Sequence, residues 1–348
     1  MATVRYLGSK ARVVGQILDL VGPPSEQDGF FVDAFCGTGV VAARAADLGW
    51  PVRINDHLRS ATIMARAQLV SSSDAPFAEL GGYEAALARL NALPGRDGFF
   101  WREYSPASET GRMYFTEENA RRIDAIRDQI NRWEASGALS GTERDLLVAD
   151  LIAAANQVAN IAGTYGCFLS RWSQSALRDL RLEPRKLRPA PVEHEVHSRD
   201  VLDVPVSPQD VAYYDPPYTK RQYAAYYHIL ETLAWGDEPE VTGKTGLRPW
   251  RDKASDYCYK SRALDALASL LRSAPAKRIF LSYSNEGHVD LDELIARIEP
   301  LGEVTLHELA AIGRYRPNRA ASAAGEEVIE YVVELEQAAV AEEEGAVT

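Results

Sequence analysis

The segment from Phe30 to Asp56 is the part of the sequence that most constrains the fold. It begins with an apolar run, FFVDAF (30–35), continues with CGTGVVAARAADLG (36–49), and ends with PVRIND (51–56), a second short run closed by an acid. This order is typical of a strand, a glycine turn, a helix and a second strand. Two strands joined through a helix form a parallel pair with a right-handed crossover. The segment therefore predicts an α/β fold built on a parallel sheet.

Further strand-like segments occur only in the second half of the chain. They are residues 195–200, 210–215, 277–284, 302–309 and 327–335, and the last two are expected to pair as an antiparallel hairpin with a long connection. The intervening residues 60–190 indicate helices instead. One helix is expected to have Thr116 as N-cap and Gly137 as C-cap, and another to begin near Ser140 or Thr142. An interruption on the order of 120 residues is too long for a connection, so we interpret it as a subdomain.

The bulk composition excludes several classes of protein. The chain has 348 residues, of which 46% are hydrophobic and 25% charged, as is usual for a soluble globular protein. No stretch approaches the roughly 18 apolar residues of a membrane span, and the start lacks the apolar core of a signal peptide. Three widely separated cysteines, Cys36, Cys167 and Cys258, predict neither a disulfide framework nor a zinc site. We therefore expect a cytoplasmic protein without membrane contact.

The charge is unevenly distributed. The formal net charge of −12 by itself argues against a polyanionic partner. However, the C-terminal EQAAVAEEEGAVT (336–348) holds four glutamates and no base, whereas RDLRLEPRKLRP (178–189) holds five bases and two acids. A basic stripe on an acidic protein can still meet nucleic acid, because the local field decides the interaction.

The turn after the first predicted strand indicates a nucleotide site. Gly37, Gly39 and Ala42 match the Gly-x-Gly-x-x-Gly/Ala spacing of nucleotide-binding turns, in which glycine lets a ligand approach the main chain. Asp56 ends the next predicted strand, where a carboxylate can accept hydrogen bonds from both ribose hydroxyls. The ligand could be a dinucleotide or S-adenosylmethionine. Asp33, just before the turn, would repel a pyrophosphate and would suit the cationic amino group of a methionine moiety.

The sequence DPPY (215–218) follows the predicted strand 210–215. Two consecutive prolines end the strand and hold Asp215 extended at its carboxyl end, where ligands bind in open α/β sheets. An exocyclic aromatic amine is a poor nucleophile, and two hydrogen-bond acceptors can draw its nitrogen toward a tetrahedral shape. Asp215 and the Pro216 carbonyl would supply these acceptors, the carboxylate bond contributing roughly 1.5–3 kcal/mol. Tyr218 would stack on the base, which is worth about 1–3 kcal/mol.

With these motifs in place, the sequence resembles the Dam-like DNA adenine methyltransferases. The segments RYLGSK (5–10), DAFCGTG, IND, SRD and DPPY occur in that family's order, and further family-like segments extend the similarity over about residues 5–335. Among them are NIAGTYGCFLSRW, GKTGLRPW and RYRPNRAAS. The resemblance implies S-adenosylmethionine contacts at Tyr6, Lys10, Asp56 and Asp215, with Phe35, Gly37 and the Asp200 region lining the pocket. It makes Asp215, Pro216 and Tyr218 the catalytic set, with Pro217 in the same motif.

The resemblance also implies a domain organisation. It predicts a class I S-adenosylmethionine-dependent methyltransferase, with a Rossmann-like mixed seven-stranded sheet. The catalytic domain would comprise residues 1–60 and 191–335, residues 61–190 would be a helical target-recognition insertion, and 336–348 a disordered acidic tail. The target adenine of double-stranded DNA would be flipped into the pocket. Candidate DNA contacts are Arg171, Arg178, Arg181, Arg185, Lys186, Lys220 and Arg221. A cognate restriction endonuclease or another defence subunit is an expected partner.

Other motifs and functions are weaker alternatives. TGKTG (242–246) lacks the spacing of a phosphate loop, because position 238 is glutamate, and HEVH (194–197) would point its histidines to opposite faces of a strand, so we predict no metal. The tyrosines of 223–227 are interpreted as core. Alternative functions are methylation of RNA adenine or of the cytosine amine, a non-catalytic DNA-binding subunit, and a nicotinamide-dependent dehydrogenase, which would leave DPPY unexplained.

Overall fold

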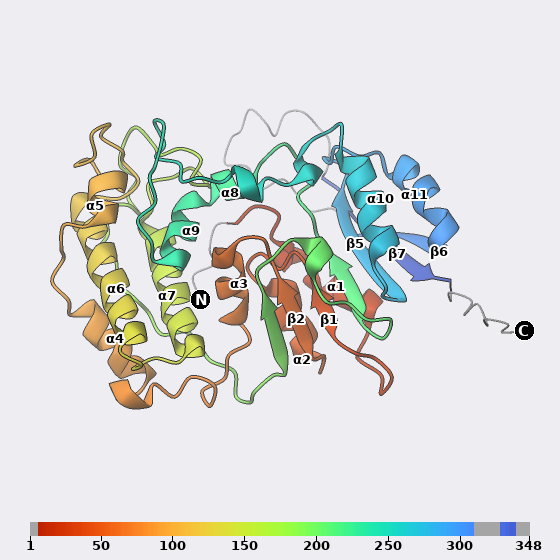
Figure 1. Cartoon of the computed structure of the whole chain (residues 1–348), viewed down its shortest axis with the longest axis horizontal. Helices are drawn as coiled ribbons and strands as arrows, with labels where there is room; N and C mark the ends of the chain where they lie inside the picture. The colour runs from red at the N-terminus through yellow and green to blue at the C-terminus, as the bar shows by residue number, and fades with distance from the viewer. Residues whose placement is uncertain (1–5, 310–327, 339–348) are drawn as a thin grey trace, which may run out of the picture.

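A single mixed sheet of seven strands organises one half of the molecule (Figure 1). The computed structural model describes residues 6–309 and 328–338. The strands are β1 (Phe31–Asp33), β2 (Val52–Asn55), β3 (His194–His197), β4 (Val211–Tyr214), β5 (Arg278–Ser284), β6 (Gly302–Glu308) and β7 (Glu330–Gln337). Their order across the sheet is β3-β2-β1-β4-β5-β7-β6. All seven predicted strands are therefore confirmed, with small shifts at their ends.

The direction of the strands follows the sequence prediction. β1 pairs in parallel with β2 and β4, and β4 with β5. β7 is inserted antiparallel between β5 and β6, which makes the sheet mixed and confirms the predicted hairpin. Because β1, β2 and β4 are parallel, their carboxyl ends meet at one edge of the sheet.

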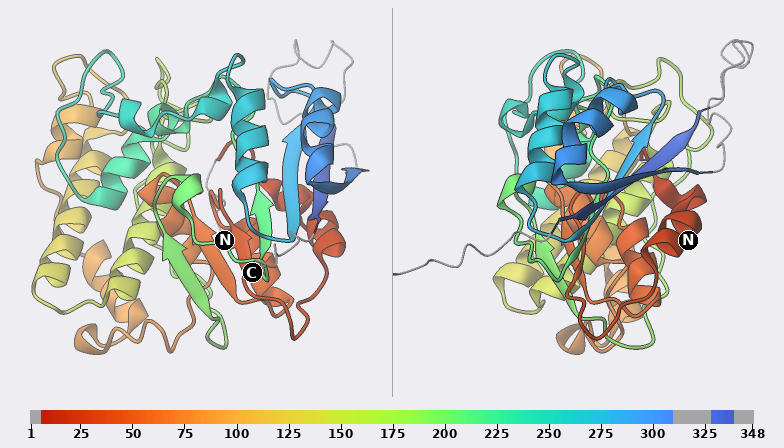
Figure 2. Two further views of the ribbon diagram at one scale, coloured as in Figure 1. Left: turned by 45° about the vertical axis from the view of Figure 1, so that its right-hand side comes forward. Right: turned by 90° about the vertical axis from the view of Figure 1, so that its right-hand side faces the viewer.

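Helices cover both faces of the sheet. The helices are α1 (Val14–Val21), α2 (Val40–Asp47), α3 (Arg59–Arg66), α4 (Tyr83–Asn91), α5 (Phe99–Tyr104), α6 (Glu117–Ala135), α7 (Gly141–Val158), α8 (Tyr223–Tyr226), α9 (His228–Trp235), α10 (Ala263–Ser273) and α11 (Leu291–Ile298). Apolar side chains of α1 and α2 form a buried cluster with one face of the sheet, and those of α10 and α11 with the other. Figure 2 shows this layering, with the red α1 and the blue α11 on opposite sides of the sheet. None of the helices in the described residues is long and apolar enough to cross a membrane.

The long helices form a second body beside the sheet (Figure 1). The Thr116 side chain accepts from the Asn119 backbone at the start of α6, and Ser140 and Glu143 form a reciprocal capping box at the start of α7. Gly137 follows the C-cap of α6 with a φ of 76°, a conformation that glycine adopts without strain. The predicted start and end of α6 and the predicted start of α7 are therefore correct to within about one residue.

The structure changes two of the expected boundaries. The core of the helical body extends beyond the insertion 61–190, because it also contains buried residues of α9, such as Ile229 and Leu233. The strand β7 runs through Gln337, which pairs with Gly302, so the first two residues of the expected tail 336–348 belong to the sheet. The remaining tail glutamates and the segment RYRPNRAAS lie outside the described residues.

Candidate active site

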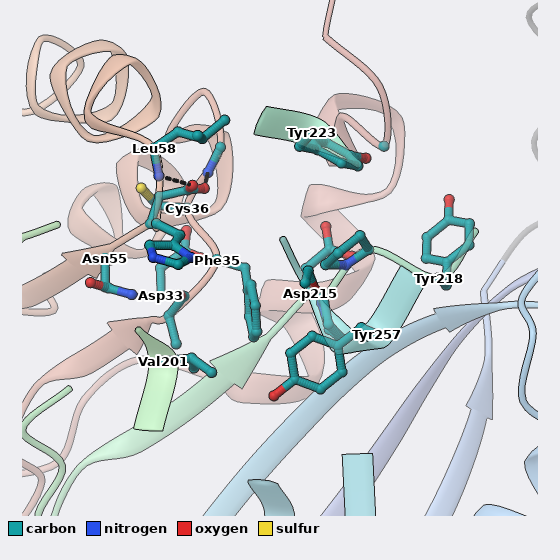
Figure 3. Close-up of a pocket in the computed structure, with 18 of the residues that line it drawn as sticks. Asp33, Phe35, Cys36, Asn55, Leu58, Val201, Asp215, Tyr218, Tyr223 and Tyr257 are labelled. Carbon is teal, nitrogen blue, oxygen red and sulfur yellow. Dashed lines mark hydrogen bonds between the residues drawn. The ribbon is translucent and has the colours of Figure 1, made fainter. Parts of the chain in front are cut away.

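A cavity of about 430 Å³ opens where the carboxyl ends of β1, β2 and β4 meet. Its wall combines the N-terminal segment, the glycine turn, the residues after β2 and β3, the DPPY motif and residues 253–257. A volume of a few hundred Å³ is typical of small-molecule sites. Figure 3 shows Asp33, Asn55 and Leu58 at one end of the cavity, and Asp215, Tyr218 and Tyr223 at the other.

The glycine turn brings the main chain close to its neighbours. Gly39 has a φ of 80° and precedes α2 as its N-cap. A Cβ atom added to Gly39 would lie 2.4 Å from the Ala65 Cα atom in α3, so only glycine allows this approach. At Gly37, with a φ of 49°, an added Cβ would lie 3.1 Å from the Tyr6 ring. The turn is therefore fixed between α3 and the N-terminal segment.

Asp33 presents a buried carboxyl group to the cavity. The residue is 1% exposed, and its Oδ2 atom accepts a hydrogen bond from the Ala42 backbone at 3.2 Å. Its Oδ1 atom has no hydrogen-bond partner among the residues that the structure describes. Burial, with Asp215 as the next cause, raises the pKa of Asp33 to about 8. Since buried polar atoms normally have partners, this oxygen fits a ligand that brings a cation or a donor.

Asp56 is held rigidly at the end of β2. Its two oxygens accept from the backbone N–H groups of Gly37, at 3.1 Å, and Leu58, at 2.9 Å. Burial raises the pKa of Asp56 to about 6, although both hydrogen bonds oppose the shift. Each oxygen keeps a lone pair, so the group could accept from two ribose hydroxyls. Asp200 also lines the cavity, and its side chain accepts from the Leu202 backbone at 3.0 Å.

Asp215 belongs to a buried cluster of charges. The Lys10 Nζ atom lies 3.0 Å from Asp215 Oδ1 and 3.2 Å from Glu330 Oε2. Burial raises the pKa of Asp215 to about 6, against the opposing effect of Lys10, and Glu330 raises it further. Burial alone would lower the pKa of Lys10, but Asp215 raises it above its usual value. The lysine therefore stays charged and favours an ionised Asp215.

Aromatic side chains form much of the cavity wall. Tyr6 stacks on Tyr227 with ring centroids 4.4 Å apart, and it contacts Tyr223 at 5.7 Å. Phe35 meets the Tyr257 ring edge-on at 5.6 Å. At the Asp215 end, Tyr218 packs edge-on against Tyr283 of β5, with ring centroids 5.7 Å apart. These rigid faces suit a flat aromatic ligand.

The wall includes residues that the sequence did not indicate, among them Tyr223, Lys253 and Tyr257. The core interpretation of 223–227 holds for Tyr227, which is 0% exposed, but Tyr223 lines the cavity. Lys253 and Tyr257 line it as well, because Gln222 binds the Ser255 backbone through both its amide oxygen and its amide nitrogen. Gln222 lies 33 positions before Ser255, and no sequence motif indicates the contact between them.

Comparison with known proteins decides the family. Residues 6–295 match the sequence model of the D12 class N6 adenine-specific DNA methyltransferases. The chain belongs to this family. It is 35% identical over 291 residues to the type II methyltransferase M.FokI of Planomicrobium okeanokoites, covering 82% of this chain and 45% of that protein. It is 34% identical over 308 residues to M.NlaIII of Neisseria lactamica, covering 87% and 90% of the two chains.

A third relative has similar length. M.CviAII of Paramecium bursaria Chlorella virus 1 is 28% identical over 337 residues, which cover 95% of this chain and 98% of the relative. The chain thus spans less than half of M.FokI but nearly all of M.NlaIII and M.CviAII. The sheet and its reversed hairpin agree with the class I methyltransferase fold that the motifs implied.

The basic residues singled out in this D12-class chain lie outside the cavity lining. Five are exposed, namely Arg171, Arg178, Arg181, Lys186 and Lys220. Arg221 is half-buried next to the DPPY turn. Arg185 differs, because its Nε atom donates to the buried carboxylate of Asp150 at 2.7 Å. Arg185 therefore stabilises the helical body, and its guanidinium group is largely committed to that ion pair.

Proposed function

We propose that this chain transfers a methyl group from S-adenosylmethionine to the N6 amine of an adenine in double-stranded DNA. The observation that carries the proposal is the position of Asp215. It follows β4 at the open edge of the sheet, is fixed by Pro216 and Pro217, and shares one cavity with Asp33 and Asp56.

The cofactor end of the cavity would be formed by the residues after β1 and β2. Asp33 would hold the ammonium group of the methionine moiety through its unpartnered Oδ1 atom. Asp56 would accept from the ribose hydroxyls, and Phe35 with Tyr6 would supply apolar contact. When bound, S-adenosylmethionine supplies an electrophilic methyl group. The Lys10 ammonium forms ion pairs with Asp215 and Glu330, so we assign it to positioning Asp215 rather than to binding a cofactor carboxylate.

The substrate end would be formed by the DPPY motif. The ionised Asp215 carboxylate and the Pro216 carbonyl would accept the two N–H groups of the adenine amine, and Tyr218 would lie against the ring. Methyl transfer leaves a cationic nitrogen, which then loses one proton to water, so no strong base is needed. An adenine inside a duplex cannot reach this cavity, and it must be flipped out at a cost of a few kcal/mol.

The DNA would lie across the open edge of the sheet and the helical body. The helical body (residues 61–190 with α9) would provide target recognition, and Arg171, Arg178, Arg181 and Lys186 would provide phosphate or base-edge contacts. Lys220 and Arg221 would hold the phosphate of the flipped nucleotide. M.FokI and M.NlaIII are named type II methyltransferases, and StsI a modification methylase. We therefore propose a cytoplasmic modification enzyme of a restriction–modification or related defence system, acting beside a cognate endonuclease.

The test is incubation of unmethylated DNA with radiolabelled S-adenosylmethionine, followed by nucleoside digestion and mass analysis. We expect label in 6-methyladenine, and its loss in Asp215→Ala but not in Asp292→Ala, an exposed acid of α11. Label in a cytosine nucleoside, or transfer only to RNA, would reassign the substrate. DNA binding without any transfer, or an unchanged rate in Asp215→Ala, would refute the proposed function.

A further inference from the structure

The segment TGKTG, which the proposed active site does not use, forms a closed turn between α9 and α10. Thr242 and Leu247 exchange two backbone hydrogen bonds, each of 2.9 Å, and the Gly246 N–H donates to the Gly243 carbonyl at 3.2 Å. Gly243 and Gly246 have φ values of 71° and 66°. The turn is thus fixed by its own backbone and requires glycine at two positions.

A buried arginine holds this turn from inside. Arg112 is 7% exposed, and its guanidinium group donates to the carbonyls of Gly243, at 3.1 Å, and Lys244, at 3.3 Å. The Glu103 carboxylate neutralises the arginine at 3.0 Å. An added Cβ at Gly246 would lie 3.0 Å from the Arg112 Nε atom, so the glycine allows the arginine to pack against the turn. The side chain of Lys244 is left exposed.

The orientation of these carbonyls determines where the neighbouring N–H groups point. In a trans peptide the C=O and the following N–H point in opposite directions. The carbonyls of Gly243 and Lys244 point toward Arg112, so the N–H groups of Lys244 and Thr245 point away from it. Two successive N–H groups that face the same way can bind an anion, and Lys244 adds an exposed ammonium group to the same turn.

The turn is connected to the substrate end of the cavity through buried aromatic residues. The Tyr104 hydroxyl donates to the Gly246 carbonyl at 3.1 Å, and its ring packs against Tyr114 at 5.9 Å. The Tyr114 hydroxyl donates to the Tyr165 carbonyl at 2.8 Å, and the Tyr165 N–H donates to the Tyr226 carbonyl in α8 at 2.9 Å. Helix α8 begins five residues after Tyr218. Figure 1 shows the chain between α9 and α10 running along the same upper side of the molecule as α8.

We propose that the turn 242–247 binds a backbone phosphate of the DNA, through the N–H groups of Lys244 and Thr245 and the Lys244 ammonium group. This proposal rests on the proposed function in taking DNA as the partner. It places a DNA contact outside the insertion 61–190, on a turn that is rigid before DNA arrives. A rigid phosphate contact would fix the position of the duplex along the protein without reading its sequence.

The test compares duplex affinity among full-length variants. A fluorescein-labelled, mixed-sequence DNA duplex is titrated by anisotropy over a salt series with wild type, Lys244→Ala, Lys244→Arg and Lys277→Ala. Lys277 is an exposed lysine just before β5, at the edge of the sheet opposite the cavity, and it serves as the matched control. Loss of one phosphate contact is expected to weaken binding about tenfold and to reduce the slope of log K against log salt by about 0.9. Lys244→Arg should retain most of the affinity.

The outcomes separate this inference from the proposed function. Equal affinities and equal salt slopes for Lys244→Ala and Lys277→Ala would overturn the phosphate contact, even if the enzyme methylates DNA. Absence of duplex binding by the wild type would overturn it too. A specific loss in Lys244→Ala supports it whether or not methyl transfer is detected, because binding is measured without turnover.

Discussion

Replacing Lys10 by methionine should move the acid limb of methyl transfer to higher pH. In the proposed mechanism only an ionised Asp215 accepts a hydrogen bond from the amine, so the transfer rate should fall as the pH drops through about 6, the pKa of this carboxyl. The Lys10 ammonium, 3.0 Å away, lowers that pKa, whereas the Glu330 carboxylate raises it. Lys10→Met removes the stabilising cation and keeps a long apolar side chain in its place.

The size of the effect follows from the burial of the ion pair. Removing one partner of a buried pair costs about 3–5 kcal/mol, and one pKa unit corresponds to about 1.4 kcal/mol, which gives an upper bound of about 2–4 pKa units. The Asp215 side chain is 16% exposed, so water replaces part of the electrostatic stabilisation that is lost with Lys10. We therefore expect the midpoint to rise to about pH 7 or above. Glu330→Gln removes the neighbouring anion and should lower the midpoint below that of the wild type.

Single-turnover rates with saturating DNA and cofactor, measured from about pH 5 to pH 9, report the transfer step without the binding of either ligand. Lys253→Met is the matched control, because Lys253 lowers the pKa of Asp56 and donates to the His57 carbonyl at 2.8 Å. It should weaken cofactor binding and leave the midpoint of the transfer step unchanged. If Lys10→Met and Glu330→Gln shift the midpoint in the same direction, or neither shifts it, the assignment of the limb to Asp215 is refuted.

Three further predictions concern stability and DNA affinity. Gly39→Ala should lower the free energy of unfolding, measured in urea, by about 2–4 kcal/mol, because its Cβ would lie 2.4 Å from the backbone of α3. Gly15→Ala should raise the free energy of unfolding by about 0.5–1 kcal/mol, because Gly15 lies in α1 with open space around it. In the folded protein Asp33 keeps its proton up to about pH 8, whereas in the unfolded chain it loses it near pH 4. The cofactor-free wild type should therefore lose stability relative to Asp33→Asn as the pH rises from about 4 to 8. Parallel curves of unfolding free energy against pH for the two proteins would contradict this. Arg185→Ala should lower the free energy of unfolding by about 3–5 kcal/mol, because it leaves the buried Asp150 unpaired. Lys186→Ala should leave that free energy unchanged, and it should reduce the slope of log K for DNA binding against log salt by about 0.9.

The sheet could be predicted from the sequence because its signals are local. The central strands β1, β4 and β5 lie in short apolar runs, and the turn at Gly37–Gly39 requires a conformation that favours glycine. Thr116 and Ser140 mark helix starts by capping. The parallel arrangement then brings Asp33, Asp56 and Asp215 to one edge by topology alone. The sequence alone therefore predicts that the three acids share one site, and all three line the same cavity.

The contacts that tune the site could not be predicted, because they depend on side chains far apart in the sequence. Glu330 lies 320 positions from Lys10, and no local pattern distinguishes it from the other glutamates of β7. Tyr223 begins α8 and Tyr227 follows its last residue, yet Tyr223 lines the cavity whereas Tyr227 is fully buried. Arg185 and Lys186 are adjacent, and only the structure shows that the first is committed to Asp150.

If the proposed function holds, the same cavity would let a strongly acidic chain favour one form of its cofactor. Asp33, Asp56 and Asp215 line the cavity together with Lys10 and Lys253, and Glu330 adds a further carboxyl group beside Lys10. Burial raises the pKa values of all three aspartates. This excess of carboxyl groups makes the empty site electrostatically unfavourable, and a cationic ligand relieves it. In the proposed reaction, methyl transfer would convert the sulfonium of S-adenosylmethionine into a neutral thioether, so the field would attract the donor more strongly than the product. The acids of the cavity would thus promote exchange of product for donor, while contact with DNA is left to basic side chains outside it.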